Sequence, residues 1–323
     1  MPVNLIDRTG ADSLIPIEYA NEIIQLLPEG SLAMQLVRRV TMGAKQQRLP
    51  VLSVLPQAYW VNQTTPDIGL KETSKMGWAN KVLDAQEIAV IVPVPEAVLD
   101  DAAFDIWGEV RPRIVEAIGT LLDLAVFFGT NAPTGWPVGG INGDATTAGN
   151  VVTGNNTATN DVFDDLNAAL TMVELGGYVP SAWAGNPTLR GSLRGMRDTT
   201  RAPLYAPALT SDSPDMIWGL PIRWTRNGGW LPSAPLANAV SAIVGDWRFA
   251  ILGIRQDITM KLLTEAVISD AAGVVLLNLA QQDAVALRVV FRAGFAIAAP
   301  TTAMNAADAN KSAFAVVKPD ATP

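Results

Sequence analysis

The segment "DDAAFDIWGEVRPRIVEAIGTLLDLAVFFG", residues 100–129, carries the strongest structural signal in the chain. Apolar residues recur along it at spacings of three and four, which predicts one continuous apolar face on a long α-helix. At about 1.5 Å per residue, such a helix forms a rod of about 40 Å. The predicted apolar face comprises Phe104, Trp107, Val110, Ile114, Ile118, Leu121, Leu122, Ala125 and Phe128.

Both ends of this helix have recognisable signals. Either Asp100 or Asp101 can cap its first turn, where the helix dipole favours acidic residues. Gly129 is the residue expected to end the helix. Pro112 lies inside the segment and has no backbone N–H to donate, so we expect a kink or an early break there.

Two β-rich segments precede the helix, "RLPVLSVLPQAYWV" at 48–61 and "GWANKVLDAQEIAVIVPVP" at 77–95. The residues between them are mostly polar, and this pattern predicts a long β-hairpin. A hairpin of this kind buries little against itself, so Trp60 and Trp78 need a partner surface. That surface belongs either to the hairpin's own domain, as for a folded-back flap, or to another molecule.

The rest of the chain mixes helices and strands. Helices are predicted over 161–177 and 186–198, the second with Asn186 as its cap and Pro187 at its first position. Strands are predicted at 180–186 as an edge strand, at 220–225, and through the last third, followed by a small and polar tail from Thr301 that is expected to be partly loose. The β-rich segments 83–95 and 284–299 are expected to pair, which makes the part between them an insertion.

Composition limits the chemistry, because the 323 residues include no cysteine and no histidine. The first absence excludes disulfides, thiolate metal sites and cysteine nucleophiles. The second removes the usual general base, proton shuttle and metal ligand. There is also no G-x-x-x-x-G-K-[ST] run to bind phosphate. We therefore expect no enzyme activity, no cofactor and no metal.

Charge and hydropathy exclude further classes of protein. The net charge is −8 and no run of Lys and Arg exceeds two residues, which disfavours a dedicated reader of nucleic acid. Asp7, Glu18 and Glu22 interrupt the N-terminal apolar stretches, which argues against a signal peptide. No apolar run approaches the ~20 residues of a membrane helix, so we expect a soluble protein made inside a cell, with no membrane partner.

The order of these segments resembles that of the major capsid proteins of tailed bacteriophages, which have the Hong Kong 97-type fold. Residues 58–129 resemble the family's extended loop, peripheral strand and spine helix. "WGLPI" at 218–222 resembles its Gly-x-Pro strand, "GDWRFAILGIRQDITMKLLTE" at 245–265 its Gly-Asp and Arg segment, and "DAVALRVVFRAGFAIAAPTTA" at 283–303 its closing strand. The resemblance covers about residues 14–303.

This resemblance implies an α+β fold with an N-terminal arm, an extended β-hairpin loop, a long spine helix, a peripheral domain and an inserted axial domain. The implied boundaries are 1–35 for the arm, 36–52 and 83–130 for the peripheral domain with the spine helix, 53–82 for the extended loop, 131–250 for the axial domain, 251–303 for the return strands of the peripheral domain and 304–323 for a C-terminal tail.

The implied function is assembly of pentamers and hexamers into an icosahedral virion shell around double-stranded DNA, built in the host bacterial cytoplasm. The partners are then other copies of the chain, non-specifically bound DNA, and portal, scaffolding and decoration proteins. Many relatives carry an N-terminal scaffolding segment; here the arm is reached within about fifteen residues, so scaffolding is separate or dispensable, or the numbering differs. The DNA-facing candidates are Arg8, Arg38, Arg39 and Lys45.

The arm and the extended loop would link neighbouring subunits. Candidate contact residues are Trp60, Asp67, Lys71, Glu72, Lys75, Trp78, Arg201 and Tyr205. Some relatives join a loop lysine to an asparagine with the help of a glutamate. Here Lys71 and Lys75 are the available lysines, but the partner positions fall near Asp283 and Val290. Valine cannot accept the lysine's proton, so we expect non-covalent links.

Two other functions remain open at this point. One is an encapsulin, a nanocompartment shell of the same fold that encloses a cargo enzyme; the long hairpin argues against it. The other is an unrelated acidic hydrolase that uses Asp100 and Asp101, or Asp164 and Asp165. Adjacent acidic residues at helix starts are more simply explained as caps and dipole partners.

Overall fold

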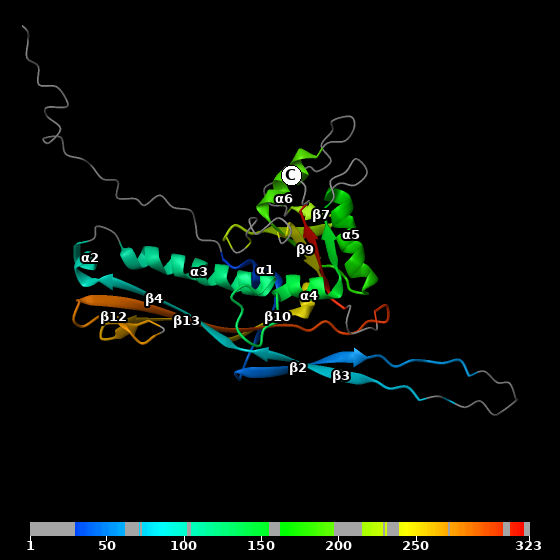
Figure 1. Ribbon diagram of the computed structural model, residues 1–323, viewed down its shortest axis with the longest axis horizontal. Helices are drawn as coiled ribbons and strands as arrows, with labels where there is room; N and C mark the ends of the chain where they lie inside the picture. The colour runs from blue at the N-terminus through cyan, green and yellow to red at the C-terminus, as the bar shows by residue number, and fades with distance from the viewer. Residues whose placement is uncertain are drawn as a thin grey trace, which may run out of the picture.

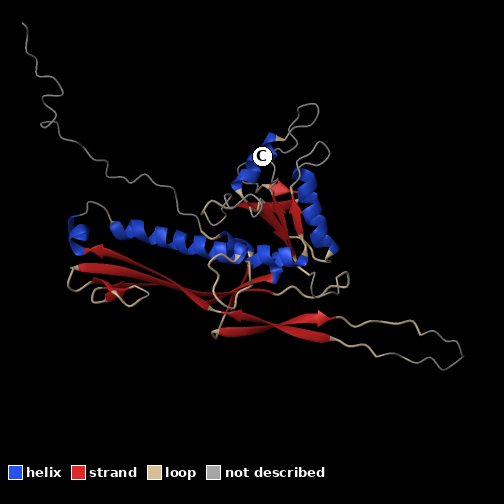
Figure 2. Ribbon diagram, in the orientation of Figure 1, coloured by secondary structure: helices blue, strands red, loops and turns tan. Residues whose placement is uncertain are grey.

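A computed structural model of the chain describes residues 30–61, 71, 73–101, 105–154, 162–196, 215–228, 230, 239–270, 272–305 and 311–319. One long helix, α3 (Ile106–Phe128), lies along a four-stranded sheet, and a second sheet with its helices stands at one end of α3 (Figure 1). A two-stranded hairpin projects from the same end, as Figure 2 shows.

The four-stranded sheet joins distant parts of the chain. Its strands lie in the order β1 (Arg38–Thr41), β10 (Ala250–Leu263), β13 (Ala284–Ile297) and β4 (Gln86–Pro95). Strands β4 and β13 run antiparallel from the pair Gln86 and Ala293 to the pair Pro95 and Ala284. This register confirms the predicted pairing of the two β-rich segments. Because β4 is an edge strand, its prolines remove no ladder hydrogen bond from a second neighbour.

The predicted hairpin is confirmed as β2 (Gln46–Val54) paired with β3 (Gly77–Asp84). Its ladder shifts at Ser53, between the pairs that Leu52 and Val54 make. Strands β11 (Val267–Ser269) and β12 (Val275–Asn278) form a second, short hairpin between β10 and β13.

The long helix is confirmed, but its start is not where we predicted. Asp105 caps α3 by accepting from the backbone N–H of Gly108, whereas Asp100 and Asp101 end a separate short helix, α2 (Glu96–Asp101). Helix α3 continues through Pro112, so the expected break does not occur. Gly129 ends it in the left-handed conformation, as predicted (φ 64°).

A buried carboxylate fixes the N-terminal part of the chain to α3. Asp123, 1% exposed, accepts hydrogen bonds from Ser31 Oγ at 2.5 Å, from the backbone N–H groups of Leu32 and Ala33 at 2.9 Å, and from Asn227 Nδ2 at 2.6 Å. The two N–H groups belong to the first turn of α1 (Leu32–Leu36), which has no acidic residue of its own there. Burial raises the pKa of Asp123, and the four hydrogen bonds offset part of that rise.

The second sheet has six strands in the order β5 (Val151–Thr153), β14 (Phe314–Lys318), β9 (Ala242–Gly245), β6 (Ala182–Gly185), β8 (Leu220–Trp224) and β7 (Met216–Ile217). Helices α4 (Gly140–Ala148), α5 (Val162–Leu175) and α6 (Pro187–Gly195) and the 3₁₀ turn η3 (Trp247–Phe249) accompany it. The helices predicted over 161–177 and 186–198 are confirmed as α5 and α6, and Asn186 caps α6.

One prediction for this sheet is wrong, because β6 lies between β9 and β8 and is therefore an interior strand and not an edge strand. The tail predicted to be partly loose from Thr301 contains an ordered strand, since β14 lies between β5 and β9. The side chain of Phe314 is fully buried, with its ring 5.2 Å from that of Trp247. The physical reason is the apolar run 313–317, which completes the core of the sheet.

We predict that Asp123→Asn lowers the free energy of unfolding by about 2 kcal/mol, because a buried N–H donor replaces an acceptor that faces four donors. Urea denaturation measures this change. The exposed Glu174→Gln is the matched control, with an expected change within about 0.5 kcal/mol. Equal stability of the two variants would contradict the role assigned to Asp123.

We predict that Phe314→Ala lowers the same free energy by about 3–5 kcal/mol, because it leaves a cavity inside the six-stranded sheet. Met304→Ala, at a residue that is largely exposed, serves as the control. A loss below about 1 kcal/mol for Phe314→Ala would mean that β14 is not part of the stable fold in solution.

Candidate interaction surface

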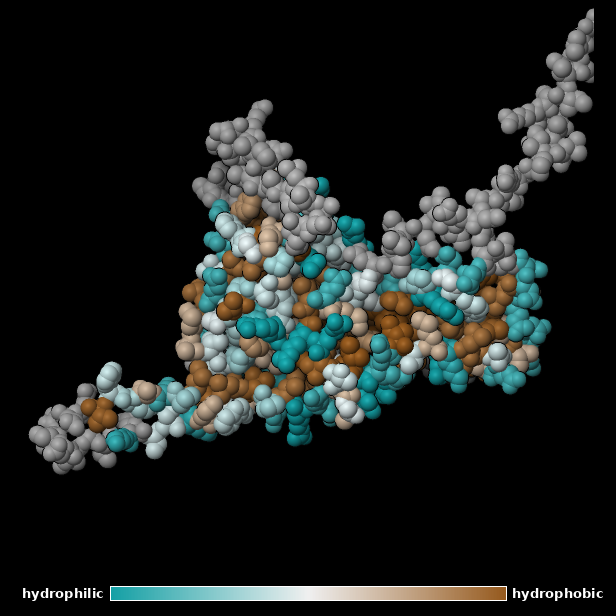
Figure 3. All heavy atoms as spheres, turned by 180° about the vertical axis from the view of Figure 1, so that it is seen from behind, coloured by the Kyte–Doolittle hydropathy of each residue, from teal (hydrophilic) through white to brown (hydrophobic). Residues whose placement is uncertain are grey.

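The projecting hairpin exposes large apolar side chains. Trp60 is 95% exposed, Trp78 is 64% exposed and Tyr59 is 49% exposed. Figure 3 shows hydrophobic residues on the hairpin and where it joins the body. Since the hairpin extends away from the sheets in Figure 1, it is not a flap folded over its own domain. Exposed apolar area of this kind marks a site for another molecule.

The hairpin itself is held together and held in place. Beyond the last ladder pair, the backbone N–H of Gln57 donates to Ser74 Oγ at 2.6 Å, which joins the two arms. At the base, Thr301 donates twice to β2, from its N–H to the Leu52 carbonyl at 2.9 Å and from Oγ1 to the Ser53 carbonyl at 3.0 Å. Ser53 is the residue at which the ladder shifts, and its backbone carbonyl is the acceptor for Thr301 Oγ1.

The segment that carries Thr301 is also bound to the residues between α5 and β6. Tyr178 Oη donates to the Pro300 carbonyl at 2.8 Å, and Thr302 Oγ1 donates to the Gly176 carbonyl at 2.6 Å. Burial, with a smaller contribution from the negative charge of Asp144, raises the pKa of Tyr178 to about 12, so the hydroxyl keeps its proton at neutral pH. Residues 300–302 therefore connect the hairpin base to the end of α5.

Two glycines let the end of β3 cross the four-stranded sheet closely. Gly253 and Gly294 face each other on β10 and β13. A Cβ atom on Gly294 would stand 2.7 Å from the Asp84 carbonyl oxygen, and one on Gly253 would meet Leu83 and Met42. The close approach forms a small core at the hairpin base, made of Met42, Val51, Leu83, Ala85, Ile251, Ala296 and Ala298.

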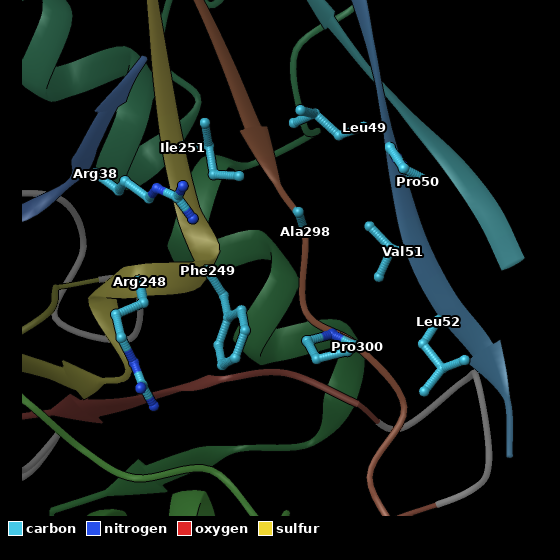
Figure 4. Close-up of a pocket in the computed structure, with 10 residues that line it drawn as sticks. All are labelled: Arg38, Leu49, Pro50, Val51, Leu52, Arg248, Phe249, Ile251, Ala298 and Pro300. Atoms are coloured by element: carbon cyan, nitrogen blue, oxygen red, sulfur yellow. The ribbon is translucent and has the colours of Figure 1, made fainter.

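A groove lies beside this small core, between β2 and the body of the molecule (Figure 4). We call it the base groove; its volume is about 430 Å³. Leu49 to Leu52 form one wall, and Arg38, Arg248, Phe249, Ile251, Ala298 and Pro300 form the other. It is a mainly apolar groove with two arginines.

The two arginines differ in what they contact. Arg248 donates from Nε and Nη2 to the two carboxylate oxygens of the buried Asp246, at 2.8 and 2.6 Å, and this partner raises the pKa of Arg248. Its side chain points away from the space in Figure 4. Arg38 has no hydrogen-bond or ion-pair partner within the described part of the chain, and its side chain points toward the groove.

The predicted site residues are spread over several regions. Lys71 and Lys75 are exposed on the hairpin. Arg38 and Arg39 are exposed on β1, and Lys45 is exposed just before β2. Val290 lies in β13 and Asp283 directly precedes it. Arg8, Asp67, Glu72, Arg201 and Tyr205 lie outside the described residues.

No sequence pattern indicates the base groove. Its walls come from four segments, 38, 49–52, 248–251 and 298–300, that only the tertiary fold brings together. Thr301 is likewise an ordinary threonine until its position against Leu52 and Ser53 is known.

Nothing in the described chain favours the hydrolase alternative. Asp100 and Asp101 belong to α2 and Asp164 and Asp165 to α5, at opposite ends of the molecule in Figure 1. Among the described residues there is no group of three or more Asp, Glu, His or Cys that could hold a metal ion. No helix in the described ranges is both long and apolar enough to span a membrane.

The chain is similar to phage proteins over most of its length. The model of the phage capsid family matches residues 11–304. The major capsid protein of Staphylococcus phage 80alpha is 29% identical over 312 residues, covering 92% of this chain and 86% of that protein.

Solved structures from phages are also similar to this chain over most of its length. Those from Microbacterium phage Oxtober96 and Mycobacterium phage Adephagia are 37% and 34% identical, with TM-scores of 0.83 and 0.84. They cover 98% and 99% of this chain and 100% of their own. The capsid of a native GTA particle, at 18% identity and a TM-score of 0.68, shares the fold. The chain therefore belongs to the phage capsid family, and it is a major capsid protein of a phage shell.

Proposed function

We propose that copies of this chain form pentamers and hexamers that close into an icosahedral shell around double-stranded DNA. The observation that supports this most directly is the exposed Trp60 on a hairpin that is rigidly attached and extends away from its own body. An apolar side chain in that position gains nothing in the isolated chain, but it gains buried area against a second copy.

The proposed fold is of the Hong Kong 97 type. In it, α3 is the spine helix, the four-stranded sheet is the core of the peripheral domain, and the six-stranded sheet is the core of an inserted axial domain. The pairing of β4 with β13 supports the insertion, because five of the six strands of the second sheet come from the chain between them. We extend the proposed axial domain to include β14, from the segment 304–323 that the resemblance assigned to a tail.

The charged residues of the hairpin would lie at the rim of the contact between subunits. Lys71 and Lys75 are exposed, and acidic Asp67 and Glu72 are their neighbours in the sequence. Exposed ion pairs contribute about 0–1 kcal/mol each, so they would set register and salt sensitivity more than affinity. Arg201 and Tyr205, in the Pro-rich part of the inserted domain, would lie near the symmetry axis of each capsomer.

Contact with DNA in this proposal is non-specific. The candidate residues Arg8, Arg38, Arg39 and Lys45 offer cations to phosphate without any element that could read base edges. Portal, scaffolding and decoration proteins are further proposed partners, and assembly would take place in the host bacterial cytoplasm. The match to the phage capsid family argues against an encapsulin-type shell around a cargo enzyme.

We predict that the purified chain at high concentration forms closed shells in negative-stain images, and that shells isolated from infected or expressing cells contain nuclease-protected DNA. A chain that stays monomeric under these conditions would refute self-assembly. Shells without nuclease-protected DNA would refute the enclosure of DNA.

We predict that assembled shells dissociate to single chains in denaturing electrophoresis, because Val290, where a cross-linking relative has its glutamate, has no carboxylate. The sample is boiled in detergent and compared with one in which Lys71 and Lys75 are both replaced by Arg. A ladder of multimers from the parent shells that is absent from the double variant would show that a loop lysine forms a covalent link after all.

A further inference from the structure

We propose that the base groove of one subunit receives the Trp60 side chain of a neighbouring copy. This inference rests on the proposed function, since it names the surface on which the hairpin of one subunit lies. Trp60 would be the projecting group and the base groove its receptor. Every copy carries both.

Size and polarity match between the two. The groove has a volume of about 430 Å³ and presents Leu49, Leu52, Phe249 and Pro300. A buried aromatic side chain removes about 150–250 Å² from water, and Phe249 offers a ring for an aromatic contact. Trp60 is the most exposed aromatic side chain in the described part of the chain, at 95%.

The charge of the groove also suits an indole ring. This inference assigns Arg38 to the groove in place of a contact with DNA: Arg38 points toward the groove and has no partner in the described chain, whereas Arg248 is already paired with Asp246. An unpaired guanidinium is attracted to the electron-rich face of an indole ring, more strongly than to a phenol or phenyl ring. The groove therefore has both an apolar lining and one free cation, and the hairpin carries the side chain that suits both.

The hairpin cannot bring Trp60 into its own groove. Trp60 follows Leu52 by eight residues, which places it roughly 26 Å along an extended strand at about 3.3 Å per residue. The bonds of Thr301 at the base and of Gln57 to Ser74 further out keep the hairpin from folding back. The contact is therefore made between copies.

Such a contact is heterologous, because a projecting group on one side meets a receptor on the other. Repetition of a heterologous contact closes into a ring when the rotation between copies permits it. The displacement between successive copies, roughly 26 Å by the same strand arithmetic, is about the width of a small domain. One tryptophan supplies only a fraction of the 1,200–2,000 Å² that a stable interface buries, roughly a fifth at most, so this is one anchor of a larger interface.

The absence of native cysteine allows a direct test. In the variant Val61→Cys, Pro50→Cys, one thiol lies next to Trp60 and the other on the groove wall, and both Trp60 and Arg38 are kept. Assembled shells are treated with a short bis-maleimide and run on denaturing gels. We expect a ladder of multimers, which requires residue 61 of one copy to lie beside residue 50 of the next.

Three controls locate the contact. Adding Trp60→Ala to the double variant is expected to lower the yield of cross-linked product about tenfold or more, the size of an interface hot spot. Pairing Val61→Cys with Leu276→Cys, on the exposed β12, is expected to give no ladder. Co-assembly of the two single-cysteine chains is expected to give dimers and nothing larger, because each contact is heterologous.

Each outcome separates this inference from the proposed function. Intact shells of the double variant without a ladder would overturn the docking of Trp60 in the base groove and leave the capsid function in place; another occupant, such as residues 1–29, would then be sought. A ladder that persists unchanged with Trp60→Ala would also overturn it. Failure of the parent chain to assemble would instead refute the proposed function.

Discussion

Strand β13 is the constraint on which the rest of the structure depends. It pairs with β10 on one side and with β4 on the other, so one strand near the end of the chain holds a segment that precedes it by some two hundred residues. The long helix has a sheet to lie on only because these pairs form. The glycine pair Gly253 and Gly294 sits in the same sheet and gives the hairpin its crossing point.

The hairpin base follows from that crossing. Leu83 packs with Met42 and Ile251 at the place where β10 and β13 carry glycines, which have no side chain. Thr301 then donates to Ser53, the residue at which the ladder of β2 shifts register. The base groove lies beside that small core, between β2 and the body of the molecule. A rigid projection and a receptor groove thus share one strand, so a change in the angle of the hairpin would also change the shape of the groove.

Much of this fold could be predicted from periodicity and composition. The long helix, both helices of the inserted part and the hairpin have signals that depend on neighbours in the sequence, and the pairing of 83–95 with 284–299 followed from two unpartnered β-rich segments. The helix start was misplaced because both the pair Asp100–Asp101 and the later Asp105 fit a helix cap. The short helix α2, which no periodicity predicts, ends at Asp101, so Asp100 and Asp101 belong to it and do not cap α3.

The candidate site was predictable only in part. Exposed tryptophans in a polar hairpin pointed to an interaction, since no core was near them in the sequence. The groove could not be predicted, because Arg38, Phe249 and Pro300 acquire a common function only through the tertiary fold. The interior position of β14 was not predicted for a related reason. Its apolar run is short and follows small and polar residues, so its place in a sheet becomes evident only from the tertiary fold.

The position of β14 in the sheet has a consequence for the order in which a subunit folds during translation. The strand β14 is translated after the other five strands of its sheet, so this sheet stays open between β5 and β9 until β14 has left the ribosome. The long helix and the hairpin are translated earlier than this strand. A product truncated before Phe314 would therefore lack a completed six-stranded sheet.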